Sequence, residues 1–398
     1  MVRDGNALSV IHVATSHTGG AGIAARRLNS ELNSIGVNSS FYALAKKSYS
    51  PLDNEFALER AWTQRIAGGM SRILSDRLIN QSFFSITSAP GVSTKWLITK
   101  VRDENAVLHI HNWFNLLTKR QIKKLIFSKI PIVITLHDQR FMTGGCHTAV
   151  QCTKFRKGCI ACPRVPMQFR LKVRRNNSYF SRLFKDLAPN VRIIAPSKFI
   201  QSEARQSISL KMQDIVFAPN VLSSNYVQAI QVSNRNFRAG EITLGVASLN
   251  NKDWLKGSDI VELLLNHYKD DSKVSFRFFA DVGPGREELF WNSIDCLLVP
   301  SRGDNSPNVI HEAKIRGIPV IASEVGGIPE LLIENFDFAV NGQNLNLAGF
   351  VQAIEVMRRW ENAITQPEIM LENFQNYTSG SLDTIVSTYK ELFKQPFR

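Results

Sequence analysis

The chain has 398 residues, of which 44% are hydrophobic and 21% are charged, and its net charge is +14. This composition excludes a disordered chain, and the length favours two domains over one ordinary hydrophobic core. No apolar run reaches the roughly 18 residues that span a bilayer. Residues 1–6 lack the hydrophobic stretch and the cleavage site of a signal peptide. We therefore expect a soluble or peripheral protein in the cytoplasm.

Positive charge is concentrated in the first half of the chain. Residues 1–225 hold 32 Lys and Arg against 12 Asp and Glu, a balance of +20, whereas residues 226–398 hold 16 against 22, a balance of −6. Such asymmetry predicts two domains with different partners. A basic domain suits an anionic lipid surface, a phosphorylated substrate or nucleic acid.

Strand-like and helix-like segments alternate along the first half. Short apolar runs predict strands over residues 8–14, 38–44, 107–111, 132–136, 191–195 and 214–218. Helical periodicity predicts a helix over residues 21–35 and another within residues 56–80. This alternation is typical of a parallel sheet that is covered by helices on both faces.

The polar stretch 228–240 predicts a linker, after which the alternation restarts. We expect a helix that begins near Ser258, a last helix over residues 381–393, and strands over residues 242–247, 275–280, 296–300 and 319–322. The sequence therefore predicts two successive α/β domains. Domains of this kind bind ligands at the carboxyl ends of their strands, and we expect the ligand in the crevice between them.

A glycine-rich loop, residues 15–22, lies between the first strand and the first helix. Gly19, Gly20 and Gly22 let the backbone approach a ligand, and the start of the helix offers N–H groups to an anion. Residues 20–25 match the dinucleotide fingerprint G-x-G-x-x-A. That fingerprint also requires an acidic residue at the end of the second strand, and residues 38–44 contain none. We therefore expect a phosphate-binding loop without a nicotinamide cofactor, with a plain tight turn as the alternative.

A second candidate loop follows the strand that ends at Pro300. Ser306, Pro307 and Asn308 predict the start of a helix with proline in its first turn. The unpaired N–H groups at the start of such a helix favour binding of a phosphate there.

Two carboxylates belong to this second segment. Asp304 lies in the predicted loop and Glu312 lies on the predicted helix, eight positions later. The structural alternatives are a helix cap for Asp304 and a solvated helix surface for Glu312. The segments Gly317–Ala322 and Gly326–Glu330 follow in the chain.

The ordered set of motifs resembles glycosyltransferase family 4, in particular its exopolysaccharide and colanic-acid type with a cysteine-rich insert. The resemblance covers nearly the whole chain and is carried by Gly19–Gly22, His109–His111, Thr135–Asp138, Ala195–Ser197, Pro219–Asn220, Lys256–Gly257, Pro300–Ser301 and the block through Glu330.

The resemblance implies the GT-B fold, in which two Rossmann-like domains face a cleft and a C-terminal helix crosses back to the first domain. On this basis we expect an acceptor-binding domain over residues 1–225, with a cysteine-rich insert at residues 144–165. We expect a linker over residues 226–240 after it. A nucleotide-sugar-binding domain is expected over residues 241–375, and the crossover helix over residues 376–398.

The resemblance also implies the reaction, which is transfer of a sugar from a UDP- or GDP-sugar to a glycan or lipid-linked acceptor with retention of configuration. Asp304, where the family usually has Glu, is expected to contact hydroxyls of the donor sugar. Glu312 is expected to accept hydrogen bonds from the ribose hydroxyls, because a carboxylate can accept from two hydroxyls at once. No second carboxylate stands out as a nucleophile, so we expect a same-face, internal-return mechanism.

A cationic pair on the donor diphosphate is a further implication. Lys256 fits one position, but the usual Arg partner is missing, and Lys252 is expected to substitute as a point charge. We see no Asp-x-Asp element and expect catalysis without a cofactor or a catalytic metal, with lysines and helix termini stabilising the departing diphosphate. The alternative is that these lysines are solvated and that the chain binds a donor without turning it over.

Histidines follow or occupy several predicted strands. His137 comes directly after a strand, and the resemblance implies that it contacts the donor sugar and supports turnover. Strand ends face the expected crevice, which favours this role over simple packing. His17, His109 and His111 are weaker candidates, and the last two lie on the same face of one strand.

Four of the five cysteines fall within residues 146–162, with the spacing C-x5-C-x6-C-x2-C. Cys146, Cys152, Cys159 and Cys162 suit a tetrahedral structural zinc site with no open position. Free thiols or an iron–sulfur cluster are the alternatives. The fifth, Cys296, lies on a predicted core strand and is expected to be a small buried hydrophobic residue.

Eight basic residues crowd into residues 154–175, namely Lys154, Arg156, Lys157, Arg164, Arg170, Lys172, Arg174 and Arg175. Together with Trp62, Ile66, Ile73 and Leu74 they predict docking to the anionic inner face of the membrane. Such docking would suit a lipid-linked acceptor. A solvated basic face is the alternative. A nucleic-acid-binding protein with a zinc knuckle is a second functional class, but it leaves the carboxylate spacing and residues 326–330 unexplained, so we expect no nucleic-acid partner.

Overall fold

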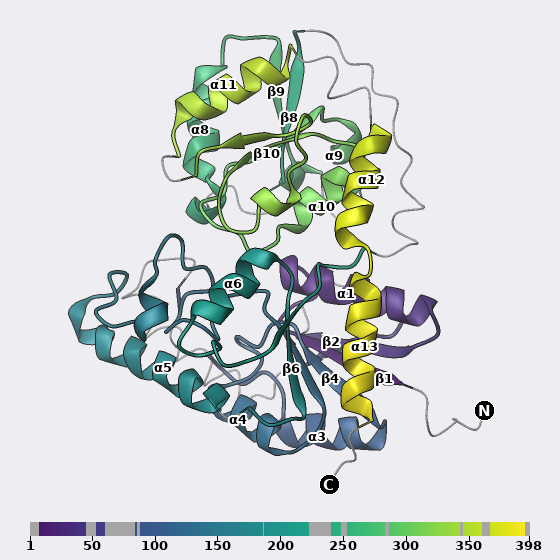
Figure 1. Ribbon diagram of the computed structural model, residues 1–398. Coiled ribbons are helices and arrows are strands. Elements are labelled where there is room, and N and C mark those ends of the chain that lie inside the picture. Colours follow the sequence, from purple (N-terminus) through teal and green to yellow (C-terminus); the bar gives the residue numbers. More distant parts are fainter. Residues whose placement is uncertain are drawn as a thin grey trace. The chain divides into compact units, whose positions relative to one another are not determined.

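The computed structural model describes residues 8–44, 53–59, 84–85, 88–185, 187–222, 240–247, 253–282, 286–342, 345–359 and 367–394. The chain divides into two compact units, one formed by Met1–Ser224 with Gly380–Arg398 and the other by Asn225–Ser379. Each unit contains a parallel sheet with helices packed on it (Figure 1). This arrangement confirms the predicted α/β class with two parallel sheets.

Unit 1 contains seven strands among its described residues, and all of them pair in parallel in the order β3-β2-β1-β4-β5-β6-β7. The strands are β1 (Ser9–Ala14), β2 (Asn38–Leu44), β3 (Glu55–Leu58), β4 (Ala106–Ile110), β5 (Ile132–Thr135), β6 (Val191–Ala195) and β7 (Ile215–Phe217). Every residue of β1, β4 and β5 is buried. Strands that are covered on both faces read as continuous apolar runs, which is why the sequence predicted them closely.

The described helices of unit 1 are α1 (Gly20–Ser34), α3 (Thr94–Asp103), α4 (Lys119–Phe127), α5 (Met167–Lys185), α6 (Lys198–Gln206) and α13 (Ser381–Phe393). Leu28 and Leu32 of α1 and Tyr389 of α13 pack in one cluster with Val10 and Val107 of the sheet. The last helix therefore returns to unit 1 after the chain has formed unit 2. Its one apolar face is buried on that sheet, as its helical periodicity predicted.

Unit 2 contains five strands in its described part, which pair in parallel in the order β12-β11-β10-β8-β9. The strands are β8 (Ile242–Val246), β9 (Val274–Phe278), β10 (Cys296–Val299), β11 (Val320–Ser323) and β12 (Phe338–Val340). The helices are α8 (Ser258–His267), α9 (Glu287–Asn292), α10 (Asn308–Lys314), α11 (Leu347–Met357) and α12 (Pro367–Thr378).

Adjacent residues of β10 belong to different cores, because side chains alternate across a strand. Leu298 packs with residues of α8 and α11, whereas Leu297 packs with residues of α9 and α10. Helices therefore cover both faces of the sheet, and the carboxyl ends of its parallel strands open onto one edge.

Several expectations differ from the structure or lie outside it. Residues 56–58 belong to strand β3 and not to a helix, so the helical prediction was wrong there. Edge pairing with β2, where Tyr42 stacks on Phe56, overrides the local periodicity. The rest of that predicted helix with its four apolar residues, and most of the predicted linker, lie outside the described residues. In the part of the chain that is described, no helix has both the length and the apolar character needed to cross a membrane.

Candidate functional site

Three loops of unit 2 meet at the carboxyl ends of three neighbouring strands. Lys256 follows β8, Asp304 follows β10, and the segment Gly326–Gly327 follows β11. Because β11, β10 and β8 are adjacent and parallel, these ends lie at one edge of the sheet. The motifs that were separated by up to about seventy positions in the sequence are therefore brought together at this edge of the sheet.

Asp304 and Lys256 form the charged centre of this cluster. Lys256 Nζ lies 2.5 Å from Asp304 Oδ2. Burial lowers the pKa of Lys256, but the adjacent Asp304 carboxylate outweighs this effect and raises the pKa overall. The ammonium therefore remains charged at neutral pH, and about two fifths of the side chain, 41%, is exposed. It can meet an anionic ligand without leaving the carboxylate.

Two glycines explain how the loops approach so closely. A Cβ atom on Gly326, which has a φ of +61°, would lie 2.0 Å from the carbonyl oxygen of Asp304, and the N–H of Gly327 donates to that oxygen at 2.9 Å. A Cβ atom on Gly257, with a φ of +75°, would lie 2.0 Å from the carbonyl oxygen of Pro300. Only glycine fits either position, because the space is filled by backbone and the conformation is left-handed. The motif glycines hold Asp304 and Lys256 in place.

Helix α10 carries Glu312 and is held from two sides. The Lys314 ammonium pairs with the Asp337 carboxylate, and both side chains are almost completely buried. Asp337 also accepts the backbone N–H groups of Val320 and Ile333. Burial lowers the pKa of Lys314, and the neighbouring Asp337 opposes that shift. This buried pair was not predicted, since a Lys two positions after a candidate Glu gives no sign of burial in the sequence.

The other anchor of α10 is Arg316, which pairs with Glu288 and donates to the backbone carbonyl of Glu312 at 2.7 Å. Glu312 itself is 8% exposed, as is Asn308 at the start of the helix. The structural alternative for Glu312, an acid on a solvated helix surface, is therefore excluded. Pro307 lies one position before the helix and not in its first turn. The Ser306 hydroxyl hydrogen-bonds the buried His311 ring at 3.2 Å.

The structure does not describe Lys252, the second cation of the predicted pair. Arg302 is in the neighbouring loop, but its guanidinium binds the Asp259 carboxylate through two hydrogen bonds of 2.6 Å and lies over the Trp254 ring. Arg302 therefore fastens its loop to α8, and the described residues contain no second arginine beside Lys256.

The glycine-rich loop of unit 1 connects β1 to α1. Gly19, with a φ of +91°, and Gly20 are exposed, and no atom lies within 4 Å of a Cβ atom built on Gly19. Gly22 is buried, and a Cβ atom there would lie 2.0 Å from the Ser16 carbonyl oxygen. Gly22 is thus required by the turn itself, whereas Gly19 and Gly20 are exposed at the start of the helix.

His137 follows β5 and lies at the end of a row of buried histidines. Its Nε2 is 3.0 Å from Nδ1 of His111, and Nε2 of His111 is 2.9 Å from Nδ1 of His12. His109 forms a separate pair of contacts, with the Tyr389 hydroxyl at 2.6 Å and the Thr135 hydroxyl at 2.7 Å. His12 was not singled out from the sequence, because a histidine within an apolar run reads as a core residue. His17 is buried and packs edge-on against Phe41, away from this row.

Burial determines the charge state of these histidines. It lowers the pKa of His12 to about 3 and that of His137 to about 4, where the nearby Asp138 only partly opposes the shift. Burial also lowers the pKa values of His109 and His111 well below the usual range. All four rings are therefore neutral at pH 7, and His137 can exchange hydrogen bonds with a ligand without carrying charge.

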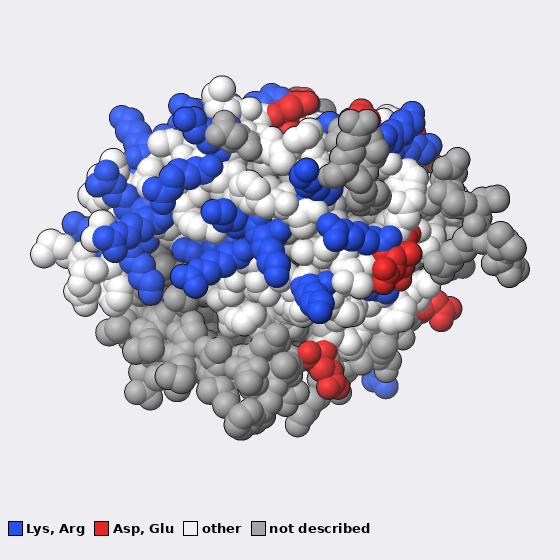
Figure 2. Space-filling view, turned by 90° about the horizontal axis from the view of Figure 1, so that it is seen from below, with Lys and Arg blue, Asp and Glu red and all other residues white. Residues whose placement is uncertain are grey.

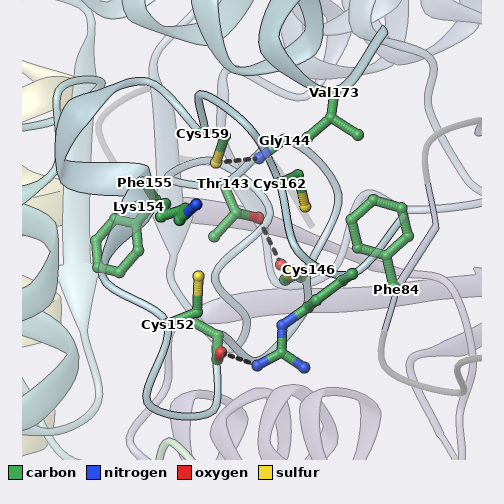
Figure 3. A pocket seen from close by; sticks show the side chains of 12 residues that line it. Phe84, Thr143, Gly144, Cys146, Cys152, Lys154, Phe155, Cys159, Cys162 and Val173 are labelled. Atoms are coloured by element: carbon green, nitrogen blue, oxygen red, sulfur yellow. Dashed lines mark hydrogen bonds between the residues drawn. The ribbon is translucent and has the colours of Figure 1, made fainter. Parts of the chain in front are cut away.

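The four clustered cysteines line one pocket of unit 1, between β5 and α5 (Figure 3). Cys146, Cys159 and Cys162 are buried, and Cys152 is partly buried. The N–H of Gly144 donates to Cys159 Sγ at 3.3 Å. Cys159 and Ala161 have left-handed φ values of +55° and +49°. Non-glycine residues seldom adopt this conformation unless other interactions hold the turn.

The pocket suits zinc in the kind and number of its donors, and Figure 3 shows the labelled Cys152 and Cys159 sulfur atoms directed into it. Burial raises the pKa of Cys159 to about 12 and also raises the pKa values of Cys146 and Cys162. Among the described residues, three ligand atoms come within 4.8 Å of one another only at His12, His109 and His111. The four pocket cysteines do not form such a group, so their sulfur atoms would have to move closer together to bind one ion. Cys296 is fully buried in β10, as a core residue should be.

Comparison with known proteins finds a family whose sequence model matches part of unit 2. Residues 262–358, which include the loop of Asp304 and helix α10, match the sequence model of the family Glycosyl transferases group 1. A comparison with curated protein sequences finds no match.

Solved structures of similar fold cover nearly the whole chain. Sucrose-phosphate synthase (tll1590) from Thermosynechococcus elongatus has a TM-score of 0.63 at 14% identity, over 97% of this chain and 99% of that one. A glycosyltransferase from Rickettsia africae ESF-5 has a TM-score of 0.58 at 12% identity, over 98% and 100% of the two chains. Anabaena Alr3699/HepE in complex with UDP-glucose has a TM-score of 0.54 at 15% identity, over 96% and 100%. The chain therefore has the fold of GT-B glycosyltransferases, and its residues 262–358 carry the sequence pattern of group 1 glycosyl transferases.

Proposed function

We propose that this protein is a glycosyltransferase that moves a sugar from a nucleoside-diphosphate donor to a hydroxyl group of a glycan or lipid-linked acceptor. The observation that carries the proposal is the meeting of Lys256, Asp304 and the Glu312 helix at one edge of the unit 2 sheet, within or next to the matched segment. This cluster supplies one ammonium group and two carboxylates. The Asp304 carboxylate lies in a loop beside Lys256, and the Glu312 carboxylate lies on helix α10. Such a set suits a ligand with a diphosphate, a sugar and a ribose.

Each group has a distinct role in the proposal. Lys256 binds the diphosphate, Asp304 accepts from hydroxyls of the donor sugar, and Glu312 accepts from the ribose hydroxyls. Ser306 and Asn308 border the phosphate position at the loop that leads into α10. In unit 1, the residues that we propose for donor binding are the exposed Gly19 and Gly20, with Gly22 shaping their turn.

The chemistry we propose is a substitution at the anomeric carbon on the face that the diphosphate leaves. The bond from C1 to the diphosphate oxygen breaks and a bond from C1 to the acceptor oxygen forms. Configuration is retained because the acceptor oxygen bonds on the face that the diphosphate leaves. The acceptor hydroxyl gives its proton to the departing diphosphate. Lys256 stabilises the charge that develops on the diphosphate, and His137 contacts a hydroxyl of the transferred sugar.

The donor is the first part of the proposal to test. HepE of Anabaena was solved with UDP-glucose, so UDP-glucose leads a panel of UDP- and GDP-sugars. We expect at least one member of the panel, and the matching nucleoside diphosphate, to bind in calorimetry and to raise the melting temperature of the full chain. A panel in which neither nucleotide sugars nor UDP and GDP bind would contradict the proposed function.

We infer that Cys146, Cys152, Cys159 and Cys162 hold one structural zinc ion. Four thiolates close the coordination shell, so the ion would organise the loop and not react. The loop is tied to the segment after β5, because Gln139 accepts the backbone N–H of Ala149 and its own N–H donates to the carbonyl of His147. The zinc loop would thereby support the segment that begins at His137.

We expect the purified chain to contain about one zinc ion by elemental analysis. The double variant Cys159→Ser/Cys162→Ser should lose the ion and melt at lower temperature, since metal binding contributes directly to folding. Cys296→Ala is the matched control, because this buried cysteine lies in unit 2. Full zinc content in the double variant, or iron in place of zinc, would contradict the assignment.

We also propose that the protein is cytoplasmic and that unit 1 docks on the anionic inner face of the membrane. Figure 2 shows Lys and Arg side chains gathered on one face, with few acidic groups among them. Helix α5 exposes Arg170, Lys172 and Arg174. Met167 and Leu171 of the same helix are 78% and 54% exposed. Apolar side chains among basic ones are typical of a helix that lies on a lipid surface.

Replacing Arg170, Lys172 and Arg174 together by Ala should weaken binding to anionic vesicles about 100-fold, because each basic residue near such a surface contributes about 1 kcal/mol. Co-sedimentation with vesicles of phosphatidylglycerol and phosphatidylcholine measures this effect, which salt should diminish. The matched control removes three exposed basic residues of unit 2, Lys269, Lys273 and Arg277. Equal loss in both variants, or no binding by the wild-type chain, would refute the docking surface.

A further inference from the structure

Three cations of unit 1 lie near one another where the start of α4 packs against α5. Lys119 is the first residue of α4, Arg120 follows it, and Lys172 belongs to α5. The Lys119 ammonium donates to the Asn176 side-chain oxygen and lies 5.3 Å from the centre of the Tyr179 ring. The Tyr179 hydroxyl donates to the backbone carbonyl of Lys119 at 3.1 Å. Lys172, Asn176 and Tyr179 follow one another at helical spacing, so they share one side of α5.

The electrostatics of Lys119 show that these cations act on one another. Burial lowers the pKa of Lys119, and the charges of Lys172 and Arg120 lower it further. Burial raises the pKa of Tyr179, and Arg120 opposes that shift, which places Arg120 on the same side of α5. Among the described residues, no carboxylate contributes to either shift. Like charges held together in this way repel one another, and an anion between them would relieve the repulsion.

Nothing in the described part of the chain neutralises these charges. The ion pairs between described residues of unit 1 include none of the three cations. Arg120 and Lys172 are exposed, and neither side chain makes a hydrogen bond to a described residue. Asn176 fixes Lys119 in place, since its amide also donates to the backbone carbonyl of Gly144 at 2.9 Å. Arg120 and Lys172 are therefore available to an anion, with Lys119 held beside them.

The site consists of side chains and does not depend on the start of the helix. Thr118 and Gln121 form a capping box, in which each side chain accepts the backbone N–H of the other residue. Two backbone donors at the start of α4 are thereby already used. One guanidinium and two ammonium groups remain, and such a set suits a phosphate, which accepts several charged hydrogen bonds.

The number of cations favours a phosphate that ends a molecule over one that links two parts of it. A phosphomonoester carries about 1.5 to 2 negative charges at neutral pH, whereas a phosphodiester carries about one. A terminal phosphate or a diphosphate therefore matches three neighbouring cations better. Met167 and Leu171 of the same helix are 78% and 54% exposed. They would contact the lipid around a membrane-bound phosphate, whereas a soluble phosphate would leave them in water.

We propose that Lys119, Arg120 and Lys172 bind the terminal phosphate or diphosphate group of a membrane lipid. The inference rests on the membrane docking of unit 1 proposed above and adds a headgroup preference to it. General attraction to an anionic surface brings unit 1 to the membrane, and this site selects one kind of headgroup there. The site uses residues of unit 1 alone and is independent of the donor site.

Co-sedimentation of the full chain with vesicles tests the preference. Phosphatidylcholine vesicles contain either phosphatidic acid, a phosphomonoester, or phosphatidylglycerol, a phosphodiester, and are matched for surface charge. We expect the chain to bind the phosphatidic acid vesicles at least about tenfold more tightly, which is the effect of one further charged hydrogen bond. Equal binding to the two kinds of vesicle would overturn the proposal.

The double variant Arg120→Gln/Lys172→Gln removes two of the cations without removing a hydrogen bond to a described residue. It should melt like the wild-type chain and bind both kinds of vesicle with equal affinity. Lys124→Gln/Arg174→Gln is the matched control, because it removes one exposed cation from each of the same helices and neither residue shifts the pKa of Lys119. This control should bind all vesicles more weakly and keep the tenfold preference. A preference that survives in the first variant, or disappears in the control, would contradict a specific site.

Soluble phosphates and nucleic acid are the other sources of such a group. If Arg120→Gln/Lys172→Gln abolished binding of pyrophosphate or of an oligonucleotide, and the wild-type chain did not distinguish the vesicles, the lipid assignment would be wrong. A wild-type chain that binds neither kind of vesicle would refute both this site and the membrane docking. Binding to phosphatidic acid vesicles alone would refute the general docking and support the site. A chain that prefers phosphatidic acid but binds no nucleotide sugar would refute the proposed transferase activity and leave the lipid site standing.

Discussion

Replacing Glu312 by Ala should weaken binding of the nucleotide donor about 10- to 100-fold and lower kcat/KM by at least as much. A carboxylate that accepts from two ribose hydroxyls loses charged hydrogen bonds, each worth about 1.5–3 kcal/mol. Alanine is the best helix former, so α10 should persist. The contacts that hold the helix use Lys314, Arg316 and the backbone carbonyl of Glu312, and they remain in the variant.

Calorimetry with UDP-glucose, or with the donor that the panel identifies, measures the loss. Glu262→Ala is the matched control, since Glu262 is an exposed acid on α8 of the same unit. We expect its affinity and melting temperature to equal those of the wild-type chain. Unchanged donor affinity in Glu312→Ala would remove this residue from the donor site and would contradict the assignment of the whole loop cluster.

Replacing His137 by Ala should lower kcat about 100- to 1000-fold, because hydrogen bonds to a sugar hydroxyl that strengthen in the transition state supply several kcal/mol. Affinity for the nucleoside diphosphate should stay within twofold, because the groups proposed to hold it are Lys256, Ser306 and Asn308. Single-turnover kinetics, together with calorimetry using UDP, separate the two effects. A parallel loss of UDP affinity would show that His137 acts in binding and not in turnover.

The pH profile supplies an independent check on His137. Burial lowers its pKa from 6.5 to about 4, so the neutral ring predominates above pH 4 and is protonated below it. As far as this residue is concerned, kcat should be constant between pH 5 and pH 8 and should fall below about pH 4. An inflection of kcat near pH 6.5 that His137→Ala abolishes would contradict the buried, neutral state. His267→Ala controls for histidine removal, since this ring is exposed on α8.

Continuous apolar runs made the strands predictable from the sequence. β1, β4 and β5 are buried on both faces, so their residues must be apolar at nearly every position, and the pattern survives without any knowledge of neighbours. Glu55–Leu58 failed for the opposite reason. β3 is an edge strand with two exposed residues, and its pairing with β2 is a tertiary contact that local periodicity does not contain.

The candidate site divides in the same way. The types and order of Lys256, Asp304 and Glu312 were visible in the sequence, because loops after strands carry polar residues for a limited set of reasons. The burial of Glu312 and the 2.5 Å contact between Lys256 and Asp304 were not visible. Cys146 and its three partners were likewise countable as metal donors, whereas their common pocket depends on how the insert folds against α5.

Sequence alone therefore determined the class of this protein, its two α/β halves and the residue types available for chemistry, because those follow from hydrophobic period and local composition. Tertiary structure decided which of these residues meet. His12 is the clearest case, since it reads as one more residue of an apolar strand and becomes meaningful only when the sheet places β1 beside β4 and β4 beside β5. Hydrogen bonds across neighbouring strands join residues about a hundred positions apart, and no local pattern records them.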